Sequence, residues 1–202
     1  MSRITPLATA DLPPEQQAMV DAARDMMGFT PNDLLVMARW PELVAAMMPV
    51  VGLIYGPGRV SMELKRMIAT ISSAAGGCQY CVAHTALGLE QAGVDADKQA
   101  AIWEFDTHSA FSDAERAALA FARGASQSPS AVTDADFAHL REHFSEDEII
   151  EITAVIALFG FLNRWNSSLG VPLEDMPLKH AREHLAGTGW QAGAHEPAAE
   201  DA

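Results

Sequence analysis

Residues 64–84 read LKRMIATISSAAGGCQYCVAH, and the fold that we expect follows from this stretch. Its first part has the apolar spacing of a helix, and Ser61 just before it is a typical helix cap. Gly76 and Gly77 lack side chains and favour a turn that ends this helix. A second helix is predicted from Cys78 to about Gln91. Two helices joined by a glycine turn would therefore place both cysteines of the chain at a helix start.

The other segments have the same helical character. Alanine, leucine, methionine and glutamate dominate between short breaks of glycine, proline, serine or aspartate, and no convincing alternation with a period of two residues indicates a strand. The sequence therefore predicts an all-α, single-domain protein. The other helices that we expect are 14–27, 41–55 with a kink at Pro49, a short one from Asp95, one after the capping residue Ser112, and 146–169 after the capping residue Ser145.

Composition divides the chain into three parts. Residues 1–58 are expected to form an amphipathic N-terminal helical arm, residues 59–186 the core with the cysteines, and residues 187–202 a loosely ordered tail. The arm is rich in methionine and leucine and can bury its apolar face against a second copy, so we expect a homo-oligomer. Segments 66–78 and 151–163 share their length and apolar register. An internal repeat of two helical halves is therefore one hypothesis.

Charge and hydropathy limit the partners that we expect. The 202 residues carry a net charge of −14, which opposes binding to nucleic acid and to anionic membrane surfaces. No apolar run reaches the length of about 20 residues that spans a bilayer, and no signal-peptide core precedes Pro13. We therefore expect a cytoplasmic protein with neither nucleic-acid nor membrane partners.

Cys78 and Cys81 are the strongest candidates for chemistry. Residues three apart share a helix face, so the two sulfurs can reach each other, and His84 shares that face. Backbone amides at a helix start stabilise a thiolate, the reactive form of cysteine. A redox dithiol is therefore the preferred interpretation. Two others stay open: a zinc site completed from elsewhere in the chain, although no second CxxC exists, and two buried, inert cysteines.

Three stretches of the sequence, taken together, carry a likeness to a known family. The first is LKRMIATISSAAGG followed by CQYCVAH, and the other two, further along, are FSDAERAALAFARG and LFGFLNRWNSSLG. Together they resemble the alkylhydroperoxidase D-like, peroxidase-related branch of the carboxymuconolactone decarboxylase superfamily. The resemblance covers residues 61–176 and implies an all-α bundle that acts as a thiol-dependent peroxide reductase or related dithiol oxidoreductase, without metal or organic cofactor. It also implies a hydroperoxide substrate, a separate dithiol reductant and a homo-oligomer. By the same resemblance, Cys81 attacks the peroxide and Cys78 closes the disulfide.

The two proton-relay positions of that family hold other residues in this chain. The family's glutamate falls on Arg66 and its histidine on Thr85. His84 is one position from the second place and Glu63 is about one helical turn from the first, so each is a candidate replacement. Arg66 can instead lower a cysteine pKa as a nearby cation. The competing hypothesis is a non-catalytic, small-molecule-binding or structural member of the fold, in which the cysteines only line a pocket.

Further residues are weaker candidates. Tyr80 lies between the cysteines. Asn163 and Trp165 end the most apolar helix, where they either line the cysteine pocket or make helix-end hydrogen bonds and packing contacts. Two HxxEH motifs, 139–143 and 180–184, have the pattern of a zinc-protease helix, but each lies in a charged stretch typical of a solvated helix face. We therefore predict no metal site.

Overall fold

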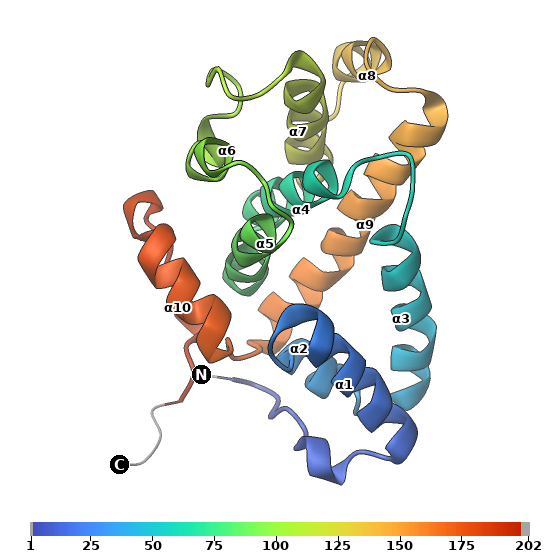
Figure 1. Cartoon of the computed structure of the whole chain (residues 1–202), viewed down its shortest axis with the longest axis vertical. Coiled ribbons are helices and arrows are strands. Elements are labelled where there is room, and N and C mark those ends of the chain that lie inside the picture. Colours follow the sequence, from blue (N-terminus) through green and yellow to red (C-terminus); the bar gives the residue numbers. More distant parts are fainter. Residues whose placement is uncertain (1, 199–202) are drawn as a thin grey trace.

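The observed architecture is helical. A computed structural model describes residues 2–198, and every regular element within them is an α-helix or a short 3-10 helix, which confirms the predicted all-α class. The helices labelled in Figure 1 are α1 (Pro14–Met27), α2 (Asn32–Met37), α3 (Pro41–Ile54), α4 (Met62–Ala75), α5 (Gln79–Gln91), α6 (Ala96–Ala100), α7 (Asp113–Ala125), α8 (Asp134–Arg141), α9 (Glu146–Leu169) and α10 (Asp175–His184). Single 3-10 turns cover Thr9–Asp11, Ile102–Glu104, Ala186–Thr188 and Gly193–His195.

The capping residues define the helix starts, as the sequence predicts. Ser61 Oγ accepts the backbone N–H of Leu64 at the start of α4. Ser112 and Ser145 each form a capping box with the glutamate three residues later, at the starts of α7 and α9. Gly77 has a positive φ of 70° between α4 and α5, a conformation that glycine adopts at little cost. The turn that carries the cysteines is therefore built as expected.

Helix α4 lies at the centre of the bundle. It packs against α5, α7 and α9, and its middle, residues 67–73, is buried. Figure 1 shows α9 as a long diagonal helix beside α4, with α6, α7 and α8 at one end of the molecule and α1 and α2 at the other. The buried Lys65 of α4 lies 2.6 Å from Glu151 of α9 and donates to the Ile54 carbonyl at 2.7 Å. This cation ties α4 to α9 and to the end of α3. Whether segments 66–78 and 151–163 are repeats stays a prediction.

The N-terminal arm has an apolar cluster of its own. Leu12, Val20 and Leu34 are among its buried residues, and Met47 and Trp165 contact both this cluster and the main core. The arm is therefore attached to the core by packing. The structure also adds α2, which the sequence patterns did not predict.

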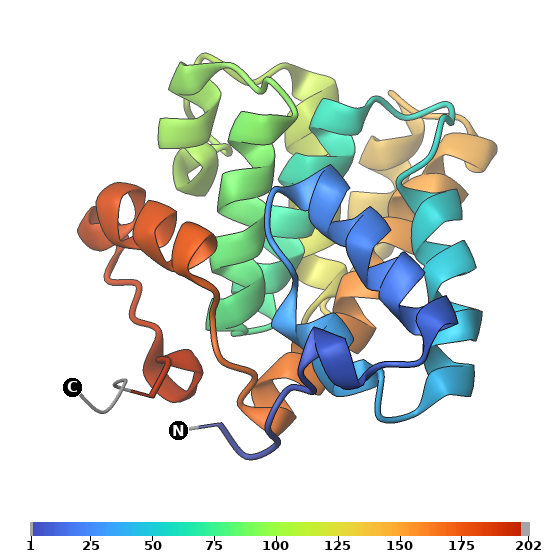
Figure 2. The same cartoon turned by 60° about the horizontal axis from the view of Figure 1, so that its bottom comes forward.

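The C-terminal segment is more ordered than the sequence predicts. Trp190 Nε1 donates to the Gln79 carbonyl at 3.1 Å, and the Leu173 N–H donates to the His195 carbonyl at 2.9 Å. His195 itself is buried. Figure 2 shows this segment returning alongside the bundle after α10. The expectation of a loosely ordered tail is therefore wrong up to residue 198, because its side chains find apolar and hydrogen-bonding partners, whereas residues 199–202 lie outside the described residues.

The length and polarity of the helices decide whether any of them could span a membrane. The longest helix in the described part of the chain, α9, has 24 residues but begins with Glu146, Asp147 and Glu148. Within residues 2–198, no helix combines the length and the apolar character that crossing a membrane requires.

Candidate active site

The two cysteines meet at the start of α5. Cys78 is the N-cap residue, and its Sγ accepts the backbone N–H of Cys81 at 3.3 Å. The two Sγ atoms lie 3.0 Å apart, so one thiol can donate a hydrogen bond to the other. Both residues are buried, with 0% and 3% of their surfaces exposed. A small rotation of the side chains would close a disulfide.

These contacts make the two thiols unequal in acidity. The hydrogen bond from the Cys81 thiol lowers the pKa of Cys78 to about 5, with His195 and Ser167 also lowering it and burial opposing them. Burial and the neighbouring Cys78 sulfur raise the pKa of Cys81. Near neutral pH, Cys78 is therefore the thiolate and Cys81 holds the proton that the pair shares. This favours Cys78 as the nucleophile, the reverse of the order that the family resemblance implies.

An amide from α9 and a carboxyl from the arm complete the surroundings of Cys81. Asn166 Nδ2 donates to Cys81 Sγ at 3.3 Å and lies 3.5 Å from Asp33 Oδ2. Desolvation raises the pKa of the Asp33 carboxyl, although His84 opposes this effect. Asp33 belongs to α2, so the N-terminal arm contributes directly to the cysteine site.

A chain of polar contacts leads from Asp33 to His84. The Asp33 N–H donates to Tyr80 Oη at 3.2 Å, and Tyr80 Oη donates to Glu174 Oε1 at 2.7 Å. The other oxygen of Glu174 lies 2.6 Å from His84 Nε2, and the Asn32 N–H also donates to this carboxylate. The rings of Tyr80 and His84 stack with centroids 4.1 Å apart. These contacts bring α2, α5 and the residue before α10 together around the cysteine turn.

His84 and Glu174 form a buried ion pair. Burial alone would lower the pKa of His84, but the Glu174 carboxylate outweighs burial and raises it. Burial would likewise raise the pKa of Glu174, but the His84 charge and the hydrogen bonds to the carboxylate lower it. Each partner thus favours the charged form of the other.

Of the three candidate relay residues, only His84 lies in this network. Glu63 is exposed in the first turn of α4, and at about 1.5 Å per residue it lies roughly 18 Å along the helix from Ala75, so the expectation that it reaches the site is wrong. Arg66 lies over the Tyr55 ring, 4.4 Å from its centroid, rather than beside a sulfur. Thr85 Oγ1 donates to the Cys81 carbonyl at 2.8 Å within its own helix. Both relay positions of the family therefore hold residues with packing or backbone contacts.

Asn163 and Trp165 make helix-end and packing contacts. Asn163 Nδ2 donates to the Ser72 carbonyl at 3.1 Å. Trp165 stacks on Phe161 and lines a groove of about 690 Å³ between α7 and α9. The residues that line this groove are not those that contact the sulfurs, so the groove is not the site of the thiol chemistry. The structural interpretation of both residues therefore fits better than a role in the cysteine pocket.

Sequence reasoning missed five residues of the site, which are Asp33, Asn166, Ser167, Glu174 and His195. The segment NRWNSS contains two of them and offered a signal, because polar side chains at the end of an apolar helix need partners. No comparable signal marks the other three, which come from the arm and from the C-terminal part of the chain.

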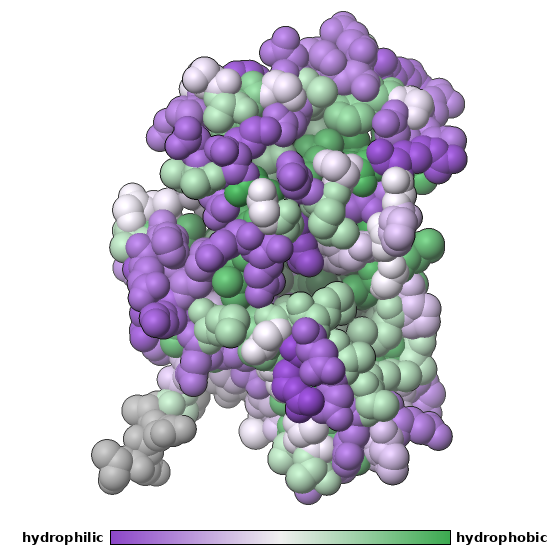
Figure 3. Space-filling view, in the orientation of Figure 1, coloured by the Kyte–Doolittle hydropathy of each residue, from purple (hydrophilic) through white to green (hydrophobic). Residues whose placement is uncertain are grey.

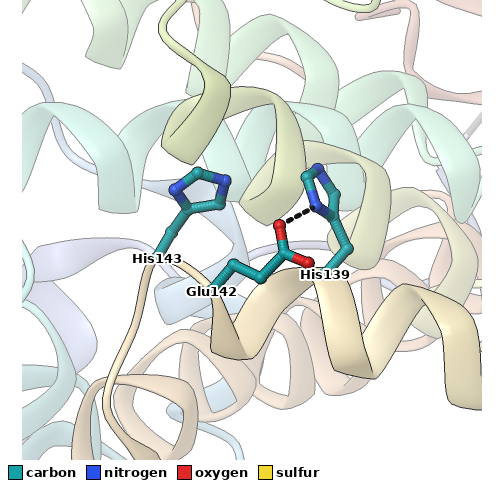
Figure 4. A group of neighbouring side chains, drawn as sticks. All are labelled: His139, Glu142 and His143. Atoms are coloured by element: carbon teal, nitrogen blue, oxygen red, sulfur yellow. Dashed lines mark hydrogen bonds and ion pairs between the residues drawn. The ribbon is translucent and has the colours of Figure 1, made fainter.

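The two HxxEH motifs lie outside this site. Figure 4 shows His139 and Glu142 in contact at the end of α8, with Nδ1 and Oε2 3.2 Å apart, and His143 close by. These side chains bring three potential metal ligands together, but all three are exposed, as on a solvated helix face. In the second motif, His180 Nε2 contacts Glu90 of α5 at 3.1 Å.

Known proteins share the segment that holds the cysteines. The model of the carboxymuconolactone decarboxylase family matches residues 41–124, which include the glycine turn and the CxxC motif. The structure is also similar to a cysteine-to-alanine variant of the debrominase Bmp8 in complex with 2,3,4-tribromopyrrole. The two are 36% identical with a TM-score of 0.85, and the match covers 91% of this chain and 97% of the debrominase. The chain belongs to the carboxymuconolactone decarboxylase family.

Other relatives agree with this membership. A peroxidase-related protein from Ralstonia eutropha JMP134 with an alkylhydroperoxidase AhpD core is 28% identical with a TM-score of 0.77, over 87% of this chain and 94% of that one. The YnjA protein of Escherichia coli K12 is 33% identical over 99 residues, which are 49% of this chain and 54% of YnjA. The chain therefore matches only about half the length of this curated relative. The match to the family model ends at residue 124, so Asn166, Glu174 and His195 lie outside it.

Proposed function

We propose that this protein is a dithiol reductase that uses Cys78 and Cys81 to transfer two electrons to a small, apolar electrophile. One observation carries the proposal: a Cys78 thiolate with a pKa of about 5 lies 3.0 Å from a thiol that can close the disulfide. Cysteines buried only for packing have raised pKa values and react slowly. The low pKa of Cys78 therefore favours an enzyme over a non-catalytic member of the fold.

The proposed reaction has two steps. The Cys78 thiolate attacks atom X of a substrate R–X, which forms an S–X bond and releases R as an anion that takes up a proton. The Cys81 thiol then attacks Cys78 Sγ, displaces X as an anion and releases its own proton as the disulfide forms. A thiolate, a thiol and R–X thus give R–H, X⁻ and a disulfide. The substrate gains the two electrons that the dithiol loses.

A halogenated small aromatic ring, with X a halogen, is the first candidate for the substrate. It is supported by the identity of 36% with the debrominase Bmp8 over 91% of this chain. The burial of both sulfurs, 0% and 3% exposed, also favours a small apolar substrate over a protein disulfide. A hydroperoxide, with X a hydroxyl group, is the second candidate. It is supported by the likeness to the peroxidase-related protein with the AhpD core.

The oxidised pair needs an external dithiol to return it to the reduced state. The two steps use only the cysteines and mobile protons, so the proposal requires neither a metal nor an organic cofactor. The network of His84, Tyr80, Asp33 and Glu174 can hold protons close to the sulfurs.

The proposal is tested by incubating the reduced protein, without oxygen, with equimolar 2,3,4-tribromopyrrole or cumene hydroperoxide. We expect one of the two compounds to be reduced, with one Cys78–Cys81 disulfide formed per molecule. Mass spectrometry measures the disulfide and chromatography measures the loss of substrate. With dithiothreitol in excess, the reaction should become catalytic. If neither compound is consumed and the thiols stay unreactive, the protein is a non-catalytic member of its fold.

Single cysteine variants test the order of attack. We expect Cys78→Ser to abolish reaction with the substrate, because it removes the thiolate. Cys81→Ser should still allow one attack and leave Cys78 as a sulfenic acid or a comparable adduct, which dimedone or mass spectrometry detects. The opposite pattern would restore the order that the family resemblance implies, with Cys81 as the attacking thiol.

A further inference from the structure

Three metal-ligating side chains meet at the end of α8, outside the cysteine site. His139, Glu142 and His143 each offer one ligand atom, and these atoms all lie within 4.8 Å of one another. His139 Nδ1 is 3.2 Å from Glu142 Oε2, and the centroids of the two imidazole rings are 5.2 Å apart. Figure 4 shows the three side chains on the same side of the turn. The charged composition of this stretch predicted only a solvated face, whereas the structure brings its ligand atoms together.

The backbone at the end of α8 holds this arrangement. The Glu142 N–H donates to the His139 carbonyl at 3.1 Å, and the His143 N–H donates to the Leu140 carbonyl at 3.2 Å, as in a 3-10 turn. Side chains three residues apart eclipse each other in such a turn, and residues four apart share a helix face. The buried Leu140 anchors the turn in the core. The side chains of His139, Glu142 and His143 are therefore directed to one place by a fixed backbone.

The surroundings of the cluster favour a cation. The last carbonyls of α8 point towards its C-terminal end, where the helix dipole is negative. Arg141, next to Glu142 in the sequence, lies 3.3 Å from Glu146 and 4.8 Å from the centroid of the Phe137 ring. Its charge is thus held by Glu146 rather than by Glu142. The net charge of −14 on the chain attracts cations further.

We propose that His139, Glu142 and His143 form a binding site for a divalent transition-metal ion of the zinc class. Imidazole nitrogens and carboxylate oxygens are ligands that zinc takes in proteins, with bonds of about 2.0–2.2 Å. Imidazole also disfavours magnesium and calcium, which prefer sets of oxygen ligands. Because all three side chains are exposed, small rotations bring their ligand atoms onto one ion, and water fills the remaining coordination position. The same exposure lets the ion enter and leave, so binding is reversible.

The second HxxEH motif, 180–184, has the same pattern but a different arrangement. The rings of His180 and His184 are also close, with centroids 4.5 Å apart. The His180 side chain is only 10% exposed, however, and its Nε2 contacts Glu90 of α5 at 3.1 Å. Within residues 2–198, this motif forms no three-ligand cluster like the one after α8. Zinc is therefore assigned to the first motif alone.

Calorimetric titration of Zn²⁺ into the full chain tests the assignment. Every sample carries Cys78→Ser and Cys81→Ser, because thiolates are zinc ligands themselves. The result then does not depend on the dithiol chemistry proposed above, and circular dichroism verifies that each variant is folded. We expect this parent protein to bind one Zn²⁺ per chain and to show no comparable binding of Mg²⁺.

Matched substitutions in the two motifs locate the ion. His139→Asn, Glu142→Gln and His143→Asn should each weaken Zn²⁺ binding by about 10-fold or more, which is at least the cost of losing an outer-shell partner. His180→Asn and Glu183→Gln are the controls in the second motif and should bind Zn²⁺ as the parent does. Zn²⁺ should also raise the Tm of the parent and of both controls more than that of His143→Asn.

Three results would overturn the assignment. One is the absence of saturable Zn²⁺ binding with a Kd below about 100 µM. Another is binding that stays unchanged in the three variants of the first motif. The third is an equal loss in the controls, which would place the ion elsewhere on the acidic surface.

Discussion

Cys78 and Cys81 are three residues apart, yet their surroundings give them different chemistry. Cys78 caps the helix, where its sulfur accepts the Cys81 N–H and lies 3.0 Å from the Cys81 sulfur. Cys81 lies inside the first turn, where burial and the Cys78 sulfur raise its pKa. The hydrogen bond from the Cys81 thiol is the main cause of the low pKa of Cys78, and the backbone N–H at the helix start adds to it.

The ion pair of His84 and Glu174 makes a pH-dependent contribution to stability. The pKa of Glu174 is lowered, so its contribution is present above the unfolded value of about 4.5 and is lost as pH falls through the folded value. The pKa of His84 is raised, so its contribution is complete below about 6.5 and is lost as pH rises through the folded value. The pair therefore stabilises the fold most between about pH 4.5 and 6.5.

Glu174→Gln tests this window. At about pH 6 we expect the free energy of unfolding to fall by about 3 kcal/mol, because His84 is left buried without its counter-ion. The loss should be smaller at about pH 9, because the contribution of charged His84 is lost as the pH rises through its raised pKa. Urea unfolding at the two pH values measures the difference. Glu183→Gln, on the exposed face of α10, is the control and should change little. An equal loss at both pH values would show that the pair is not ionic.

At the scale of elements, the turn between α4 and α5 is fixed by α9. A Cβ atom on Gly76 would lie 2.6 Å from Asn163 Nδ2, and the same amide donates to the Ser72 carbonyl at 3.1 Å. The end of α4 therefore approaches α9 so closely that only glycine fits. This contact, together with the positive φ of Gly77, sets the direction in which α5 starts.

We predict that Gly76→Ala destabilises the protein by about 1–3 kcal/mol, because the added methyl group displaces the Asn163 amide and its hydrogen bond. Thermal or urea unfolding measures the change. Gly187→Ala is the matched control, since a Cβ there meets no atom within 4 Å, and it should leave stability almost unchanged. If the two variants behave alike, the close approach of α9 does not restrict this position.

At the scale of the whole molecule, segments from both ends of the chain complete a site whose cysteines lie in the middle. Asp33 arrives from the arm and Glu174 and His195 from the C-terminal part, and all three lie around the start of α5. The arm and the C-terminal segment are therefore not simple additions to a catalytic core. Their removal should alter the acidity of the cysteines as well as the stability of the fold.

The outer surface of α3 and α9 carries exposed apolar side chains, and we predict that it packs against a second copy of the chain. Leu53 is 79% and Ile150 is 70% exposed. Figure 3 shows apolar residues gathered over α3 at the right of the molecule. Light scattering after size-exclusion chromatography should give a multiple of the chain mass for the wild-type protein and a lower mass for Leu53→Glu or Ile150→Glu. Met26→Glu on α1 is the control, because it likewise replaces an exposed apolar side chain. A monomeric wild-type protein would refute the prediction.

The sequence alone predicted the elements near the cysteines well. Ser61, the two glycines and the capping boxes at Ser112 and Ser145 act through neighbours a few residues away, so their effect is readable from local order. The class of the fold and the presence of the CxxC motif at a helix start followed from the same local signals. The short helix α2 and the ordered C-terminal segment did not, because packing against distant elements stabilises them more than their own sequence does.

The partners of the two sulfurs were decided by tertiary structure. Sequence reasoning placed His84 beside Cys81 and offered Glu63 and Arg66, since helical spacing and the relay positions of the family were its guides. In the folded chain His84 pairs with Glu174, and Arg66 lies on Tyr55. Glu63 is exposed, and the Asn166 amide donates to Cys81 Sγ. Helix periodicity relates residues within one helix, but the acidity of a buried thiol depends on whichever charges and donors the fold brings within a few ångströms of it.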